Sequence, residues 1–151
     1  QIIIEPGRFL VGNAGILVSK VVYVKTGEAR KFLIIDAAMN DLIRPSMYDA
    51  YHGIDPLVQS DEESELFDIV GPVCETGDTF ATNRPMKPMN DGDLLAIRSV
   101  GAYGAVMSST YNTRLLIPEV LVKDNKFAVV RPRPTYDEII GLDKLPPWLS
   151  E

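Results

Sequence analysis

The sequence contains a single cysteine, Cys74, among its 151 residues, so an intramolecular disulfide is impossible. No apolar run approaches the roughly 20 residues that a membrane-spanning helix requires, and no basic segment followed by an apolar one opens the chain. Basic residues are also in deficit, with 15 lysines and arginines against 21 aspartates and glutamates, a net charge of −6. This deficit disfavours a general binder of nucleic acid or of anionic membranes. The lone thiol and the missing secretion signal favour a cytoplasmic protein.

The remaining composition is that of a globular protein, with 46% hydrophobic and 24% charged residues in a chain about one domain long. Short segments rich in β-branched residues alternate with turns and predict a mostly-β sandwich or barrel with one or two short helices. Strands are expected at 16–25, 31–36, 54–59, 67–73, 93–100, 118–123 and 126–131, helices at 40–51 and 136–140, and a loop at 81–92.

The chain opens with Gln1 and then three consecutive isoleucines, Ile2 to Ile4. Three β-branched residues in a row are typical of a parallel strand that is buried on both faces. Such a strand reaches its neighbours through long crossover connections. We therefore expect the chain to be a piece of a longer polypeptide.

Two loops could bind an anion. In Glu5-Pro6-Gly7-Arg8 the glycine lets backbone amides approach a ligand closely, and the arginine offers a fork to a carboxylate or phosphate. In Gly101-Ala102-Tyr103-Gly104 the phenol could donate a hydrogen bond to the same groups. The alternatives are an ordinary surface turn and a plain strand end.

Two further segments carry reactive or charged side chains. Arg44 and Tyr48 are four residues apart, so they should project from one face of the helix and could clamp a carboxylate. The alternative is an arginine that packs over an aromatic ring. His52 would continue that face and is expected to be structural, since no second histidine completes a metal site. Cys74 beside Glu75 suits a thiol that donates a proton; the alternative is a small buried side chain.

Four motifs in this order resemble the C-terminal part of the bacterial diaminopimelate decarboxylase family. The motifs are Glu5 to Arg8, Asn40 to Pro45 with Tyr48, Gly71 to Asp78, and Gly101 to Gly104 with Met107 to Ser109. The resemblance implies a pyridoxal-phosphate-dependent carboxy-lyase that has a (β/α)8 barrel and a C-terminal β-domain. Residues 1–15 would then be the last barrel strand with its cofactor loop, and residues 16–151 would be the β-domain.

The resemblance also implies roles for individual residues. Glu5, Pro6, Gly7, Arg8 and Tyr103 would contact pyridoxal 5'-phosphate. The substrate would be bound by a set that overlaps with this one: Arg8, Arg44, Tyr48, Glu75 and Tyr103. The two arginines and Tyr48 would hold the distal carboxylate, and Glu75 the distal amino group. Cys74 would come from the partner subunit of a homodimer and protonate the α-carbon.

The implied reaction is decarboxylation of meso-2,6-diaminopimelate to L-lysine in lysine biosynthesis, at an active site that two subunits share. The lysine that binds the cofactor covalently would lie in the barrel, upstream of residue 1, so the chain by itself is expected to be inactive. No metal is expected. Two alternatives stay open: a decarboxylase for ornithine, arginine or a carboxylated polyamine, and a non-catalytic β-rich dimerisation module.

Overall fold

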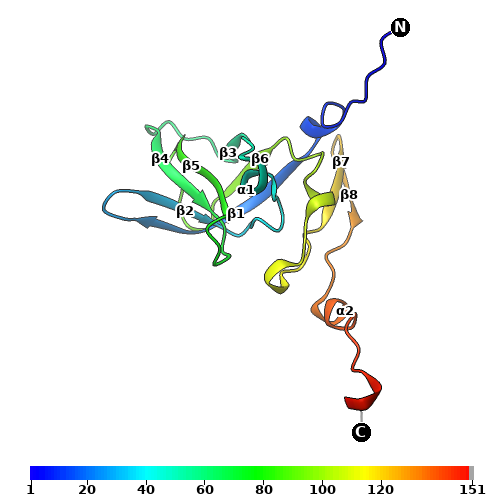
Figure 1. Cartoon of the computed structure of the whole chain (residues 1–151). Coiled ribbons are helices and arrows are strands. Elements are labelled where there is room, and N and C mark those ends of the chain that lie inside the picture. The colour runs from blue at the N-terminus through cyan, green and yellow to red at the C-terminus, as the bar shows by residue number, and fades with distance from the viewer. Residues whose placement is uncertain (150–151) are drawn as a thin grey trace. The chain divides into compact units, whose positions relative to one another are not determined.

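The computed structural model describes residues 1–149 and divides the chain into two compact units, residues 1–108 and the part from Ser109 onward (Figure 1). The first unit holds all of the predicted site residues. Its centre is a six-stranded sheet in the order β3-β6-β1-β2-β4-β5. The strands are β1 (Ile16–Thr26), β2 (Lys31–Ile35), β3 (Ile54–Pro56), β4 (Glu65–Val70), β5 (Thr79–Met86) and β6 (Leu94–Arg98).

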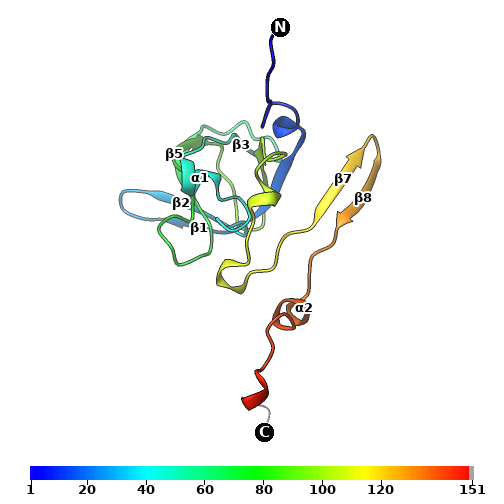
Figure 2. The same cartoon turned by 45° about the vertical axis from the view of Figure 1, so that its right-hand side comes forward.

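The sheet curls on itself in both views (Figures 1 and 2), and this confirms the prediction of a mostly-β domain. Neighbouring strands are antiparallel except β2 and β4, which are parallel. The long strand β1 pairs with β6 through residues 16–20 and with β2 through residues 21–26. It therefore connects the two halves of the sheet.

The amino-acid pattern of β1 explains which side of the sheet forms the core. Leu17, Ser19 and Val21 are buried, whereas Ile16 and Val18 between them are exposed. Successive side chains of a strand point to opposite faces, so this alternation places one face of β1 inward.

The strand β5 shows that the prediction of a loop over 81–92 was wrong in its first half. The strand lies at the edge of the sheet and pairs only with β4. An edge strand tolerates Pro85, because the missing N–H need not serve a second neighbour. Asn83, with φ of 48°, lies where the pairing with β4 is irregular. Proline and asparagine were therefore signals of an irregular edge strand.

The helix predicted over 40–51 is much shorter in the structure. Helix α1 comprises Arg44–Tyr48, with Pro45 in its first turn, and ends where Asp49 adopts a left-handed conformation. Its N-cap residue is Ile43, whose side chain makes no capping hydrogen bond. Asn40 and Asp41, which precede the helix, are buried, and Asp41 accepts a hydrogen bond from the Ala38 amide at 2.9 Å.

The first residues of the chain form no strand within the described residues. Ile2, Ile3 and Ile4 have side chains that are 92%, 80% and 75% exposed. The segment that follows is attached to the end of β6, since the Gly101 amide donates to the Gly12 carbonyl at 3.0 Å. No unit boundary lies between residues 15 and 16. The assignment of residues 1–15 to a barrel stays a prediction.

The second unit contains the hairpin β7 (Glu119–Lys123) and β8 (Lys126–Arg131) and the short helix α2 (Tyr136–Ile140), as predicted. Asp124, in the hairpin turn, has a φ of 54°. Thr135 and Glu138 cap α2 reciprocally. Four short 3-10 helices complete the described chain: η1 (Gly12–Ala14), η2 (Ala105–Met107), η3 (Tyr111–Thr113) and η4 (Pro147–Leu149). Within residues 1–149, no helix is both long and apolar enough to cross a membrane.

Candidate functional site

Arg44 and Tyr48 lie on one face of α1, as their spacing predicted. The guanidinium carbon of Arg44 is 5.6 Å from the centre of the Tyr48 ring, within the range of a cation–π contact. The alternative to a carboxylate clamp, an arginine that packs over an aromatic ring, is thus present in the structure. It also holds the two groups next to each other, and the Tyr48 side chain remains 57% exposed.

Arg8 and Tyr103 meet at the end of β6. One terminal nitrogen of Arg8 donates to the Ser99 carbonyl at 2.8 Å. A Cβ placed on Gly7 would lie 3.1 Å from the Tyr103 hydroxyl, so the phenol lies against the backbone of the Glu5–Arg8 loop. Tyr103 remains 43% exposed. The structure therefore brings together the two loops that were predicted to bind an anion.

Close backbone packing fixes the position of these loops. A Cβ on Gly101 would collide with the carbonyl oxygen of Val11, and it would also approach the Gly15 amide nitrogen. Gly101 thus lets two stretches of backbone approach each other, and this holds the Glu5–Arg8 loop near Tyr103.

Within the described residues, Arg8 and Arg44 have no carboxylate partner. Arg30, Lys31, Arg98 and Arg131 each form an ion pair with an aspartate or glutamate. The Nε atoms of Arg8 and Arg44 are buried and have no hydrogen-bond partner. Their positive charges are thus available for an anionic ligand.

His52 is only 1% exposed and lies beyond the end of α1, so the expectation that it continues the helix face was wrong. Its Nδ1 lies 2.8 Å from the Arg98 carbonyl oxygen. Burial lowers the pKa of His52, and the charges of Arg8 and Arg44 lower it further, against the opposing effect of the Arg98 carbonyl. The expected structural role agrees with this burial. The Arg8 and His52 side chains contact the carbonyls of the adjacent residues Ser99 and Arg98, and the positive charge of Arg44 also acts on the His52 ring.

Cys74 and Glu75 are exposed in the loop between β4 and β5, so the alternative of a buried thiol was wrong. Asp78 organises this loop, since its carboxylate accepts the Val73 amide at 2.7 Å and the Met39 amide at 2.6 Å. Gly77 also packs directly against Ser46 of α1. The structure therefore places the Cys74 loop beside the helix that carries Arg44.

Asp78 and His52 are buried beside these elements, and the sequence did not predict either of them as a site residue. Asp78 stands in one of the motifs and His52 four residues after Tyr48, but only burial reveals their roles. An aspartate between turn residues resembles many surface aspartates. The useful signal would have been its position next to Gly77, in a segment where backbone amides need acceptors.

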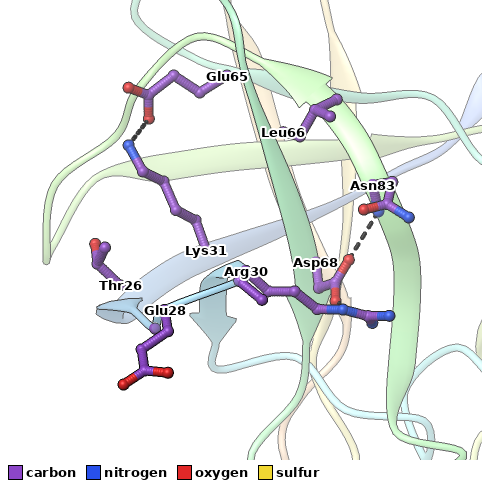
Figure 3. Close-up of a pocket in the computed structure, with 10 residues that line it drawn as sticks. Thr26, Glu28, Arg30, Lys31, Glu65, Leu66, Asp68 and Asn83 are labelled. Atoms are coloured by element: carbon purple, nitrogen blue, oxygen red, sulfur yellow. Dashed lines mark hydrogen bonds and ion pairs between the residues drawn. The ribbon is translucent and has the colours of Figure 1, made fainter.

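A pocket that lies away from these residues has a volume of about 560 Å³ (Figure 3). Its lining comprises Thr26 to Lys31, Glu65, Leu66, Asp68 and Asn83. The buried carboxylate of Asp68 is held by Arg30 at 2.9 Å and by the Asn83 amide at 2.7 Å. Lys31 pairs with Glu65. Because these charges are paired with one another, they are less available to a charged ligand than the charges of Arg8 and Arg44 are.

The geometry thus pairs Arg44 with Tyr48 on α1 and brings the Arg8 loop against Tyr103 at the end of β6, and Cys74 and Glu75 lie on a loop packed against α1. Residues 9–101 match the family described as "Pyridoxal-dependent decarboxylase, C-terminal sheet domain". Diaminopimelate decarboxylase of Zymomonas mobilis is 49% identical over 149 residues, which are 99% of this chain and 35% of that protein. The chain therefore spans about a third of the length of the curated relatives it matches.

Solved structures give the same result. Diaminopimelate decarboxylase from M. jannaschii, in co-complex with L-lysine, has a TM-score of 0.91 and 42% identity over 96% of this chain and 33% of that chain. The enzyme from Helicobacter pylori, also complexed with L-lysine, has a TM-score of 0.85 and 40% identity over 91% of this chain and 34% of that chain.

Proposed function

Because this chain belongs to the pyridoxal-dependent decarboxylases, matching their C-terminal sheet domain, we propose that it is the C-terminal domain of a diaminopimelate decarboxylase. The whole enzyme would convert meso-2,6-diaminopimelate to L-lysine and carbon dioxide. The observation that carries the proposal is the pair of arginines, Arg8 and Arg44, that have no carboxylate partner within the described chain. The lysine bound in two similar enzymes supports the same product.

The distal end of diaminopimelate carries both a carboxylate and an ammonium group. Arg44 with Tyr48, together with Arg8, would bind the carboxylate, because a guanidinium fork matches its two oxygens. Glu75 would bind the ammonium group. This pairing favours diaminopimelate over ornithine, arginine or a polyamine, whose distal ends lack the amino-acid zwitterion.

The residues at the end of β6 fit a phosphorylated cofactor. Gly7 presents backbone next to the Tyr103 hydroxyl, and the buried Nε of Arg8 has no partner. Glu5, Pro6, Gly7, Arg8 and Tyr103 would hold pyridoxal 5'-phosphate, chiefly through its phosphate group. When bound, the cofactor supplies an electron sink for the carbanion that decarboxylation generates.

Cys74 would deliver a proton to the α-carbon of the substrate after carbon dioxide leaves. Its exposure on a loop is compatible with reaching an active site of a second subunit. The active enzyme would thus be a homodimer with shared sites. Residues 1–15 would complete an N-terminal barrel that carries the cofactor-binding lysine, and the enzyme would act in the cytoplasm in lysine biosynthesis. Residues 1–151 by themselves should release no carbon dioxide from diaminopimelate.

The test uses the full-length protein and the variants Arg44→Ala and Arg44→Lys. Loss of a charge-assisted hydrogen bond of about 1.5–3 kcal/mol should raise the KM for diaminopimelate roughly tenfold to a hundredfold in Arg44→Ala. Arg44→Lys should recover only part of this, since lysine lacks the fork. Steady-state assays of carbon dioxide release measure both.

Ornithine, arginine and a carboxylated polyamine serve as control substrates. Preference of the parent protein for one of them would contradict the proposed substrate. An unchanged KM for diaminopimelate in Arg44→Ala would contradict the carboxylate clamp.

A further inference from the structure

His52 presents a hydrogen-bond problem that the proposed function does not use. Its Nδ1 lies 2.8 Å from the Arg98 carbonyl oxygen, and a carbonyl oxygen can only accept. Nδ1 therefore carries the hydrogen. In the neutral ring, Nε2 is then a bare acceptor, and it is buried without any partner. Buried polar atoms without partners are rare in proteins and call for a donor.

The arginines lack the opposite kind of partner, a hydrogen-bond acceptor. The Nε of Arg44 is a buried donor without a partner. Arg8 is anchored by the Ser99 carbonyl through a terminal nitrogen, whereas the contact of the Arg44 side chain among the described residues is with the Tyr48 ring. The Nε2 acceptor of His52 and the Nε donors of Arg8 and Arg44 are thus all buried without partners, and Arg44 is the less firmly anchored of the two arginines.

A neutral acceptor suits this position better than a carboxylate would. An aspartate or glutamate would hold the arginine but would also neutralise it, and the substrate carboxylate would then lose much of its attraction. Imidazole can orient a guanidinium while leaving its full positive charge available. Arg8 is held in the same way, by a carbonyl oxygen.

We propose that His52 is a positioning residue for substrate binding: its Nε2 accepts a hydrogen bond from the Arg44 guanidinium in the substrate-bound enzyme and so orients Arg44 toward the distal carboxylate. This inference rests on the proposed function, since it concerns the same carboxylate. The Arg98 carbonyl orients the imidazole ring of His52, and the ring in turn orients the Arg44 guanidinium. His52 itself touches neither the substrate nor the cofactor.

The kinetic test compares His52→Phe with His52→Gln in the full-length holoenzyme. Phenylalanine keeps the ring but offers no acceptor, whereas glutamine offers one donor and one acceptor. Loss of the orienting hydrogen bond, which leaves the Arg44 charge in place, predicts a rise of about threefold to tenfold in the KM for diaminopimelate in His52→Phe, with kcat within about twofold of the parent. His52→Gln should restore KM. Equal KM values in all three proteins, or a kcat that falls while KM is unchanged, would overturn the proposal.

A second measurement does not depend on activity or on how His52→Phe folds. Histidine-labelled full-length protein is titrated by NMR, with His52 assigned by its absence in His52→Gln. Among the described residues, Arg8 from the loop after Pro6 and Arg44 from α1 bring positive charge to the His52 ring, and Arg84 from β5 donates to the His52 carbonyl at 2.9 Å.

Removing one charge in Arg44→Met should raise the pKa of His52, whereas Arg133→Met, at an exposed arginine of the second unit, should leave it unchanged. A pKa that does not respond to Arg44→Met would overturn the proposal. If the parent protein fails to decarboxylate diaminopimelate while this titration behaves as expected, the proposed function fails and the contact between His52 and Arg44 stands.

Discussion

At the residue scale, the availability of each candidate side chain for a ligand follows from its partners rather than from its type. Arg30 and Arg44 are both arginines in the same unit, yet Arg30 is held by the buried Asp68 and Arg44 by no carboxylate of the described chain. Asp78 shows the reverse case of a buried carboxylate that is satisfied by backbone amides. Such differences decide which residues can bind a ligand and which stabilise the fold.

Replacing Asp78 by asparagine tests its structural role. The amide has one oxygen in place of two, so at least one of the backbone donors of Val73 and Met39 loses its acceptor. We expect the free energy of unfolding to fall by about 1–3 kcal/mol, measured by urea denaturation followed by circular dichroism. Glu75→Gln on the same loop is exposed and should change it by less than about 0.5 kcal/mol. Equal effects of the two substitutions would contradict this role of Asp78.

At the element scale, regular patterns were predictable and irregular ones were not. The alternation in β1 and the turn at Asp124 can be interpreted from sequence, because strand period and turn chemistry are local properties. The strand β5 was missed because Pro85 is tolerated only at a sheet edge, and edge position is a property of the whole sheet. The helix α1 was predicted too long because Asn40 and Asp41, which the prediction placed in the helix, are buried in a non-helical segment that precedes it.

Gly101→Ala tests whether backbone packing between the end of β6 and the segment before β1 positions Arg8. The added methyl group would meet the Val11 carbonyl, so the segment must shift. Overpacking of this kind should cost about 1–3 kcal/mol of unfolding free energy. The full-length enzyme should also lose affinity for its cofactor, measured by absorbance titration.

Gly12→Ala is the matched control in the same segment. A Cβ on Gly12 would lie 3.6 Å from the Arg8 Cβ, an ordinary contact. Its stability should remain within about 1 kcal/mol of the parent. A Gly101→Ala protein as stable as this control would show that the backbone contact is not required.

At the scale of the whole molecule, the two units differ in how much apolar surface they bury. All the buried hydrophobic residues of the described chain lie between Leu17 and Ile97. In the second unit, by contrast, Leu121 and Phe127 of the hairpin are 63% and 77% exposed, and Trp148 is 77% exposed. A hairpin without a packed face has little stability of its own.

Hydrogen exchange should reveal this difference in the 151-residue chain. The amides of β7 and β8 should exchange more than about a hundredfold faster than those of β1 and β6, because opening the hairpin exposes almost no additional apolar surface. Mass spectrometry of peptic peptides measures both regions in one experiment. Equal protection would mean that a partner surface covers the hairpin in solution.

The sequence alone was sufficient for the family and for the mostly-β architecture, and it predicted Arg8, Arg44, Tyr48, Cys74 and Tyr103 as candidate site residues. These inferences depend on local motifs and on β-branched segments separated by turns, both of which are local properties of the chain. Only the tertiary structure decided that Arg8 and Arg44 have no carboxylate partner within residues 1–149, that Gly101 packs against backbone and that His52 is buried under the influence of both arginine charges. The physical reason is that burial and charge pairing arise between segments far apart in sequence, and local patterns contain no record of them.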